Sequence, residues 1–388
     1  MLSGRFYSLV LTFYSPELIQ LKILFTLNKE FFMNKILIAT SYLTMLFASS
    51  GSAFEVNSPG GSNYAWYDVG PQCGSNYREN CGILANYEDD SVREVVKGQL
   101  RDMYTYGQRR LRIPVFHRGD GDSKTIMNSG TKANRDRIAT NVRNLVMDAK
   151  YAGFVEVMIG FFPMSDFNNP ISWDEISYNE HNDPYGDNGA TLNGLAQQEN
   201  LQTILAVRSQ IQGLIHYRID LMNEGAPPSN KHRWHWYVAR TWSDYVKITR
   251  QHHDTVGVSI IVDGGAHSTL PKERYQNMMN AYKAHSTKTP ILYSIHAYRD
   301  AGGNKDAIEA FDQFLDSQND QKGWIIGETL YTDPPTQTDF KQANIGNRDV
   351  FFVLQWPIKY PRGPSHNGTD MVNVMPWLNY YWEELRKR

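Results

Sequence analysis

The chain has 388 residues, a formal net charge of −2 and 41% hydrophobic residues. This length and apolar content exclude disorder as the main state and allow one large domain or two ordinary ones. The charge balance lacks the basic excess of a nucleic-acid-binding protein, so no nucleic-acid partner is expected. With 13% aromatic residues, including nine Trp and 23 Tyr, the composition is typical of a globular enzyme whose surface carries many rings.

A secretory signal peptide is predicted near the N-terminus. A positive charge at Lys35 follows Met33, an apolar run occupies residues 36–47, and small residues lead to Ala53. The run is short for a bilayer-spanning helix, so a stable membrane anchor is the less favoured alternative. A signal that begins at Met33 is complete by itself. Residues 1–53 are therefore interpreted as an N-terminal extension plus signal peptide, and residues 54–388 as one exported domain, periplasmic or extracellular.

The two cysteines, Cys73 and Cys81, both lie in the part expected to be exported, within a segment rich in Gly and Asn. Because export reaches an oxidising compartment, they are predicted to form a disulfide that pins one loop. Two sulfur atoms are too few to indicate a metal site. No metal or other cofactor is expected.

From Asn63 onward, short runs rich in β-branched and aromatic residues alternate with longer segments of helical period. This alternation predicts parallel strands joined by crossover helices. Eight strands are expected, at Tyr64–Val69, Arg110–Phe116, Val155–Phe162, His216–Met222, Gly257–Val262, Ile291–His296, Trp324–Leu330 and Val350–Trp356. Two of the expected helices carry clear apolar stripes: Ile138, Val142, Leu145, Val146 and Ala149 in one, and Ile308, Phe311 and Leu315 in the other.

Eight strand–helix units predict the α/β class and a single (β/α)₈ TIM barrel rather than a doubly wound sheet. No Gly-x-Gly-x-x-Gly follows the first strand and no phosphate-binding loop motif occurs, so nucleotide binding is not expected. The stretch Asp166–Gln198 follows the third strand and lacks clear periodicity. In a barrel it would lie on the catalytic face, where it is expected to form a wall of the cleft.

Two of the predicted strands end in a glutamate. The fourth ends at Asn223-Glu224 and the seventh at Glu328. Because the carboxyl ends of barrel strands converge on one face, these two carboxyl groups are expected to face each other there. A carboxylic acid paired with a carboxylate is what glycoside hydrolysis requires.

Taken together, these motifs resemble the clan of retaining (β/α)₈ glycoside hydrolases that includes the cellulase-like glycoside hydrolase family 5. Further matches, in the order expected along the barrel, are Arg112 on the second strand, Asn223 before the first glutamate, His296 and Tyr298 after the sixth strand, and Trp356 on the eighth. Two positions depart from the clan's pattern. Gly225 stands where many members have Pro, and the His that family 5 has after the third strand is not evident in residues 161–164.

The resemblance implies a role for each matched residue. Glu224 would be the general acid/base, Glu328 the nucleophile, and Asn223 would bond the sugar 2-hydroxyl. Tyr298 and Arg112 would keep Glu328 ionised. The two remaining residues would line the site, His296 near the acid and Trp356 as a stacking surface for the sugar.

The function expected is therefore a secreted or periplasmic retaining glycosidase, acting as a monomer on a β-linked polysaccharide such as a glucan, mannan, xylan or bacterial exopolysaccharide. Three alternatives stay open: a carbohydrate-binding barrel without turnover, a transglycosylase and a metal-dependent barrel enzyme. The run Lys231–Trp236 is equally compatible with sugar stacking and with the start of a helix.

Overall fold

In the computed structural model the described residues are 60–68, 73, 80–105, 107–121, 123–163, 192–227, 233–262, 270–298, 303–329, 339–340, 342–346 and 348–356. The predicted signal segment lies outside them, as does the predicted cleft wall up to residue 191. In these ranges no helix combines the length and the apolar character needed to cross a membrane.

The strands lie side by side in one sheet, and all pairings between them are parallel. Their order is β6-β5-β4-β2-β1-β10-β9-β8-β7, with β3 pairing with β2 off this path. The bounds are β1 Gly61–Asn63, β2 Arg110–Arg118, β3 Met127–Asn128, β4 Glu156–Pro163, β5 His216–Asp220, β6 Thr255–Gly257, β7 Ile260–Ile261, β8 Tyr293–Ala297, β9 Trp324–Thr329 and β10 Val350–Gln355.

The two end strands of this order, β6 and β7, are consecutive pieces of one interrupted strand, separated only by Val258 and Ser259. Since β6 pairs with β5 and β7 pairs with β8, the interrupted strand joins the two ends of the sheet. Counted this way, the sheet has the eight strand positions of a (β/α)₈ barrel, as the sequence predicts.

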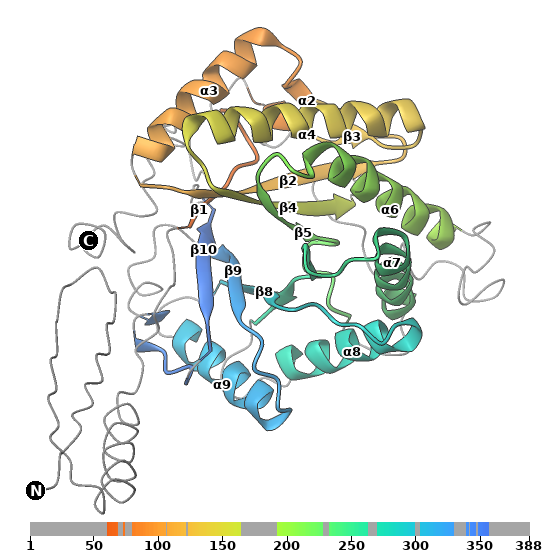
Figure 1. The fold of residues 1–388 in the computed structure, drawn as a ribbon, viewed down its shortest axis with the longest axis vertical. Coiled ribbons are helices and arrows are strands. Elements are labelled where there is room, and N and C mark those ends of the chain that lie inside the picture. Colours follow the sequence, from red (N-terminus) through yellow and green to blue (C-terminus); the bar gives the residue numbers. More distant parts are fainter. Residues whose placement is uncertain are drawn as a thin grey trace, which may run out of the picture. The chain divides into compact units, whose positions relative to one another are not determined.

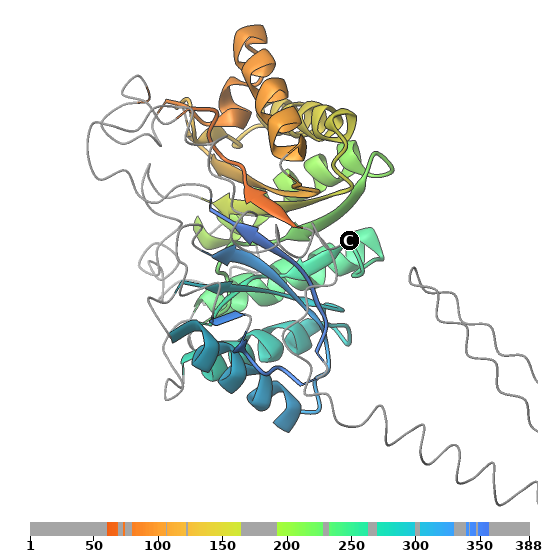
Figure 2. The same cartoon turned by 90° about the vertical axis from the view of Figure 1, so that its left-hand side faces the viewer.

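Helices surround the strands, as Figures 1 and 2 show. Their bounds are α2 Ile83–Asn86, α3 Asp90–Thr105, α4 Lys132–Ala152, α6 Leu192–Ile211, α7 Arg233–Thr249, α8 Leu270–His285 and α9 Gly303–Ser317. Both apolar stripes predicted from the sequence are buried, on α4 and on α9. The Thr131 side chain caps the start of α4 and Gly153, with φ of 110°, ends it in the left-handed conformation that glycine tolerates.

The first strand lies three residues earlier than predicted, at Gly61–Asn63 instead of Tyr64–Val69. A Cβ at Gly61 would lie 1.5 Å from the carbonyl oxygen of Arg110, so only glycine permits this approach to β2. Beyond β1 the chain leaves the sheet, and Trp66 forms an antiparallel bridge with Gly82. Of the aromatic residues that suggested a strand here, Tyr64 and Trp66 are buried and Tyr67 is partly buried.

The fifth predicted strand, Gly257–Val262, is interrupted after Gly257. Gly257 has φ of 72°, and the backbone N–H of Val258 donates to the Tyr282 hydroxyl at 2.8 Å. The N–H of Ser259 donates to Asp220 at 3.1 Å. Because side chains accept the hydrogen bonds of both backbone N–H groups, the ladder between the strands is interrupted here, and Ser259 is turned towards the end of β5.

The end of the predicted cleft wall is helical, since α6 begins at Leu192. The expectation of an aperiodic segment to Gln198 is wrong for its last seven residues. Three polar residues on this helix are almost fully buried, at 2%, 0% and 0% exposure: Gln197, Asn200 and Thr203. Because polar residues occupy the buried face of this helix, apolar residues do not recur there with a clear helical period. The sequence pattern therefore predicts no helix at this place.

Candidate active site

Arg112, on β2, is the buried cation of the site and has no exposed surface. It donates to Asn63 at 3.0 Å, to Asp220 at 3.0 Å and to Asn223 at 2.6 Å, and it also contacts Glu328. Gly160 on β4 makes room for it, because a Cβ there would lie 2.7 Å from a guanidinium nitrogen. Burial lowers the pKa of Arg112, but the charges of Glu328 and Asp220 outweigh this and raise it. One cation on β2 thus connects the ends of three other strands, β1, β5 and β9.

Glu328, the last residue but one of β9, is a nearly buried carboxylate surrounded by donors. Arg112 donates to one oxygen, and the Tyr298 hydroxyl and the Trp356 indole N–H donate to the other, the latter at 2.8 Å. Burial raises the pKa of Glu328, but the His296 ring, Arg112 and these hydrogen bonds outweigh it and hold the pKa below its usual value. Burial and the charges of Glu328 and Glu224 raise the pKa of Tyr298, so its hydroxyl keeps the proton it donates.

Glu224 lies on the turn that follows β5, and its side chain is 30% exposed. Its φ of 51° is in the left-handed region, which an ordinary side chain rarely adopts. Two contacts hold this turn: the N–H of Glu224 donates to the Ser259 hydroxyl at 2.7 Å, and the Trp234 indole donates to the carbonyl of Gly225 at 2.5 Å. On this turn the Glu224 carboxyl reaches the His296 ring, whose Nδ1 lies 3.2 Å from one of its oxygens.

Asp220 lies under this turn, fully buried at the end of β5. One of its oxygens accepts from Arg112 at 3.0 Å and from the Ser259 hydroxyl at 2.8 Å, and the other accepts the Ser259 N–H. Burial raises the pKa of Asp220, and Arg112 and His296 partly offset the rise. Since every one of these contacts presents a donor to Asp220, they favour its ionised form.

His296 lies between the two glutamates. Its Nδ1 is 3.2 Å from a Glu224 oxygen and 3.7 Å from a Glu328 oxygen. One potential ligand atom from each of the three residues lies within 4.8 Å of the others. One oxygen of Glu224 and one of Glu328 are therefore no more than 4.8 Å apart, a shorter distance than the roughly 6.5–9.5 Å between the carboxyl groups of inverting glycosidases. The same three donors could also hold a divalent cation.

Trp356 follows β10 with its indole N–H directed at Glu328 and at the Tyr298 hydroxyl, at 2.8 and 2.5 Å. One face of its ring stacks on Trp66, with centroids 5.5 Å apart. Trp66 also stacks on Phe116, which contacts Phe162. Trp356 is thus a hydrogen-bond donor to Glu328 as well as an aromatic wall.

All seven residues predicted for catalysis and substrate binding come together at this end of the barrel: Arg112, Asn223, Glu224, His296, Tyr298, Glu328 and Trp356. Three further residues of the site, Asn63, Asp220 and Ser259, are not predicted by the sequence pattern. Asp220 lies four residues before Glu224, so spacing could have suggested it, whereas Ser259 reaches the site only because β6 and β7 are interrupted. The run Lys231–Trp236 proves to be largely the start of α7, where both of its tryptophans are buried.

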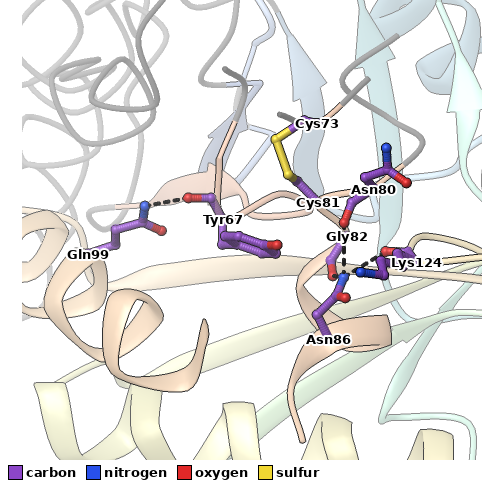
Figure 3. Close-up of a disulfide and its surroundings, with 8 residues drawn as sticks. All are labelled: Tyr67, Cys73, Asn80, Cys81, Gly82, Asn86, Gln99 and Lys124. Carbon is purple, nitrogen blue, oxygen red and sulfur yellow. Dashed lines mark hydrogen bonds between the residues drawn. A yellow bond between two sulfur atoms is a disulfide. The ribbon is translucent and has the colours of Figure 1, made fainter. Parts of the chain in front are cut away.

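The predicted disulfide between Cys73 and Cys81 is present. Figure 3 shows it beside Gly82, where the Asn86 side chain donates to the carbonyls of Gly82 and Lys124, both at 2.8 Å. The disulfide therefore closes a loop that is tied to the body of the domain at Gly82.

A closed barrel of parallel strands with paired carboxyl groups at the strand ends defines a class of fold. Known proteins share this fold. No family model and no curated protein matches the chain. Among solved structures, the fold is similar to a GH5_18 protein from Streptomyces cattleya in complex with GlcNAc, with a TM-score of 0.52 and 12% identity over 86% of this chain and 81% of that one.

A second similar structure is the β-1,4-D-mannanase from Cryptopygus antarcticus, with a TM-score of 0.50 and 14% identity over 83% of this chain and 90% of that one. An exo-β-1,4-mannosidase from Opitutaceae bacterium strain TAV5 has a TM-score of 0.47 and 11% identity over 84% of this chain, which spans 57% of its length. The two structures with TM-scores of 0.50 and 0.52 confirm that the chain has the (β/α)₈ fold of these glycoside hydrolases.

Proposed function

We propose that this protein is an exported, monomeric, retaining glycoside hydrolase that cleaves β-glycosidic bonds in a polysaccharide. The observation that supports this most strongly is the pair of carboxyl groups with opposite surroundings. Glu328 is buried among an arginine, a tyrosine and a tryptophan donor, whereas the Glu224 side chain is 30% exposed beside His296. A nucleophile needs the first environment, and a group that exchanges protons with a leaving group and with water needs the second.

In the first step, an oxygen of Glu328 attacks the anomeric carbon and the bond to the leaving oxygen breaks. Glu224 donates its proton to that oxygen, so the departing sugar leaves as an alcohol. In the second step, Glu224 takes a proton from water, and the water oxygen displaces Glu328 from the anomeric carbon. Both glutamates return to their starting states, and the product keeps the β configuration.

Asn223 is proposed to bind the sugar 2-hydroxyl. Its side-chain oxygen accepts from Arg112 at 2.6 Å, which orients the amide NH₂ as the group offered to substrate. This hydrogen bond would strengthen as positive charge develops at the anomeric centre. Trp356 would present to the sugar the ring face opposite to the one that stacks on Trp66.

The two similar structures with the higher TM-scores are a β-1,4-D-mannanase and a GH5_18 protein in complex with GlcNAc. We therefore place β-1,4-mannan and glycans containing N-acetylglucosamine first among candidate substrates, with glucan, xylan and bacterial exopolysaccharide after them. The test is incubation with this panel, with products followed by proton NMR. Release of the β anomer first supports retention, and first release of the α anomer contradicts it.

A metal-dependent reaction is the second candidate, because one potential ligand atom each of Glu224, His296 and Glu328 lies within 4.8 Å of the others. Incubation with a chelator separates the two. Our proposal predicts unchanged hydrolysis in chelator, and a loss that added divalent cations restore would favour the metal.

A further inference from the structure

We propose that Trp66 is a positioning residue for the nucleophile, and that the Cys73–Cys81 disulfide helps to hold Trp66 in place. This inference rests on the proposed function of Glu328. A continuous line of contacts leads from the disulfide to the Glu328 carboxylate.

The first part of this line is a short antiparallel pairing. Trp66 forms a bridge with Gly82, the Tyr67 N–H donates to the Cys81 carbonyl at 3.1 Å, and the Ile83 N–H donates to the Ala65 carbonyl at 2.9 Å. The backbone that carries Trp66 is thus fixed against the backbone that carries Cys81. Cys73 and Cys81 are themselves buried, at 0% and 2% exposure.

This pairing is anchored from two sides. The Gly82 N–H donates to the Lys124 carbonyl at 3.1 Å, and a Cβ at Gly82 would lie 2.7 Å from the Cα of Thr125. On the other side, Gln99 of α3 donates to the Tyr67 carbonyl at 2.7 Å, as Figure 3 shows. The disulfide closes the loop between these two anchored segments, so it limits how far they can separate.

The second part of the line is a stack of rings. Trp66 is 4% exposed and lies between Trp356 and Phe116, with centroid distances of 5.5 and 6.0 Å and interplanar angles of 30° and 23°. Trp356 is only partly buried, and Trp66 is the ring that supports one of its faces. A ring held on one face keeps its plane, and the plane of Trp356 decides whether its N–H points at Glu328.

The last contact carries the consequence for catalysis. The Trp356 N–H donates to Glu328 at 2.8 Å and is one of the interactions that hold the pKa of Glu328 below its usual value. If the indole tilts, the carboxylate loses a donor and its pKa rises. Activity that needs ionised Glu328 would then be lost at a higher pH than in the wild type.

The test compares Trp66→Ala, Trp66→Phe and the double variant Cys73→Ser/Cys81→Ser with Trp324→Phe. Trp324 is a matched control, since it is fully buried, stacks on Phe311 at 5.8 Å and begins the strand on which Glu328 lies. The acidic limb of the kcat/KM profile should move up by about 0.5 to 1 pH unit in Trp66→Ala. Trp66→Phe keeps a ring beside Trp356, so it should restore most of the wild-type position of the limb, and Trp324→Phe should show no shift.

A second measurement does not depend on turnover. Two indoles in contact give an exciton couplet in circular dichroism, which should disappear in Trp66→Phe and Trp356→Phe and persist in Trp324→Phe. The double cysteine variant should weaken the couplet and shift the acidic limb in the same direction as Trp66→Ala, by a smaller amount. Thiol labelling of the unreduced, denatured wild type should find both cysteines unreactive.

The outcomes separate the two proposals. If Trp66→Ala leaves the acidic limb where it is in the wild type, Trp66 is not a positioning residue. If the double cysteine variant keeps the full couplet and the wild-type limb, the disulfide has no part in holding Trp66. If the wild type cleaves no glycan while the couplet changes as expected, the contact geometry stands and the proposed function fails.

Discussion

β9 and β5 each place one glutamate at the same face of the barrel, but the two carboxyl groups have different surroundings. Glu328 lies within a buried strand, and three side chains donate to its carboxylate. Glu224 stands on a left-handed turn with its side chain 30% exposed, and its backbone is held more tightly than its carboxyl group. The difference shows how one fold gives two identical side chains different chemical roles. Hydrogen-bond donors keep Glu328 ionised, whereas the turn leaves the Glu224 carboxyl exposed enough to exchange protons.

Removing the carboxylate at the end of β9 should have the largest effect. Glu328→Gln keeps the shape of the side chain but removes the nucleophile, so kcat should fall by on the order of 10⁴- to 10⁶-fold for every substrate, however good its leaving group. Steady-state kinetics on an activated aryl glycoside and on the natural glycan checks this. A variant that lost activity only on the poor leaving group would reverse the assignment of the two glutamates.

Removing the carboxyl group at the end of β5 should discriminate between substrates. Glu224→Ala should lose about 10²- to 10⁴-fold on a glycan whose leaving group needs a proton. On an activated aryl glycoside, Glu328 should still be glycosylated, and the intermediate should accumulate because no base activates water. Pre-steady-state release of the aryl group, with intact-protein mass measured in parallel, should show a burst and an adduct; equal losses on both substrates would contradict this role.

The turn that carries Glu224 can be tested separately from its carboxyl group. Ser259→Ala removes the acceptor of the Glu224 N–H and a donor to buried Asp220, so we expect kcat about tenfold lower and unfolding free energy lower by about 1 to 3 kcal/mol. Ser294→Ala is the matched control, because this buried hydroxyl on β8 has no hydrogen-bond partner in the described residues. Chemical denaturation and kinetics should find the control close to wild type, and equal effects in both variants would remove the role given to Ser259.

The smallest expected effect is on the pH dependence of stability. The pKa of Glu328 is lowered in the folded state, so its ionised form stabilises the fold fully above the unfolded pKa of about 4.3, and this contribution is lost as the pH falls through the lower folded pKa. The unfolding free energies of wild type and Glu328→Gln, measured across this range, should therefore converge on acidification. A constant difference at all pH values would show that the carboxylate is not held ionised by its donors.

The sequence predicted the barrel because strand and helix periods alternate along most of the chain, and it predicted the two glutamates because each follows a strand pattern. It failed where backbone geometry departs from those periods. Ser259 lies in an expected strand, and only the left-handed Gly257 and the Tyr282 hydroxyl turn it towards Asp220. Trp66 lies in the segment expected to form the first strand. Its place beside Trp356 depends on a pairing with Gly82, which the spacing of apolar residues does not predict.

During turnover Glu328 is expected to become covalently bonded to the sugar. A 2-deoxy-2-fluoro glycoside with an activated leaving group, made from whichever sugar the glycan panel identifies, would form this bond and slow its hydrolysis. Peptide mapping by mass spectrometry should find the label on Glu328 in the wild type and on no residue in Glu328→Gln. A label on Glu224, or labelling that persists in Glu328→Gln, would contradict the account.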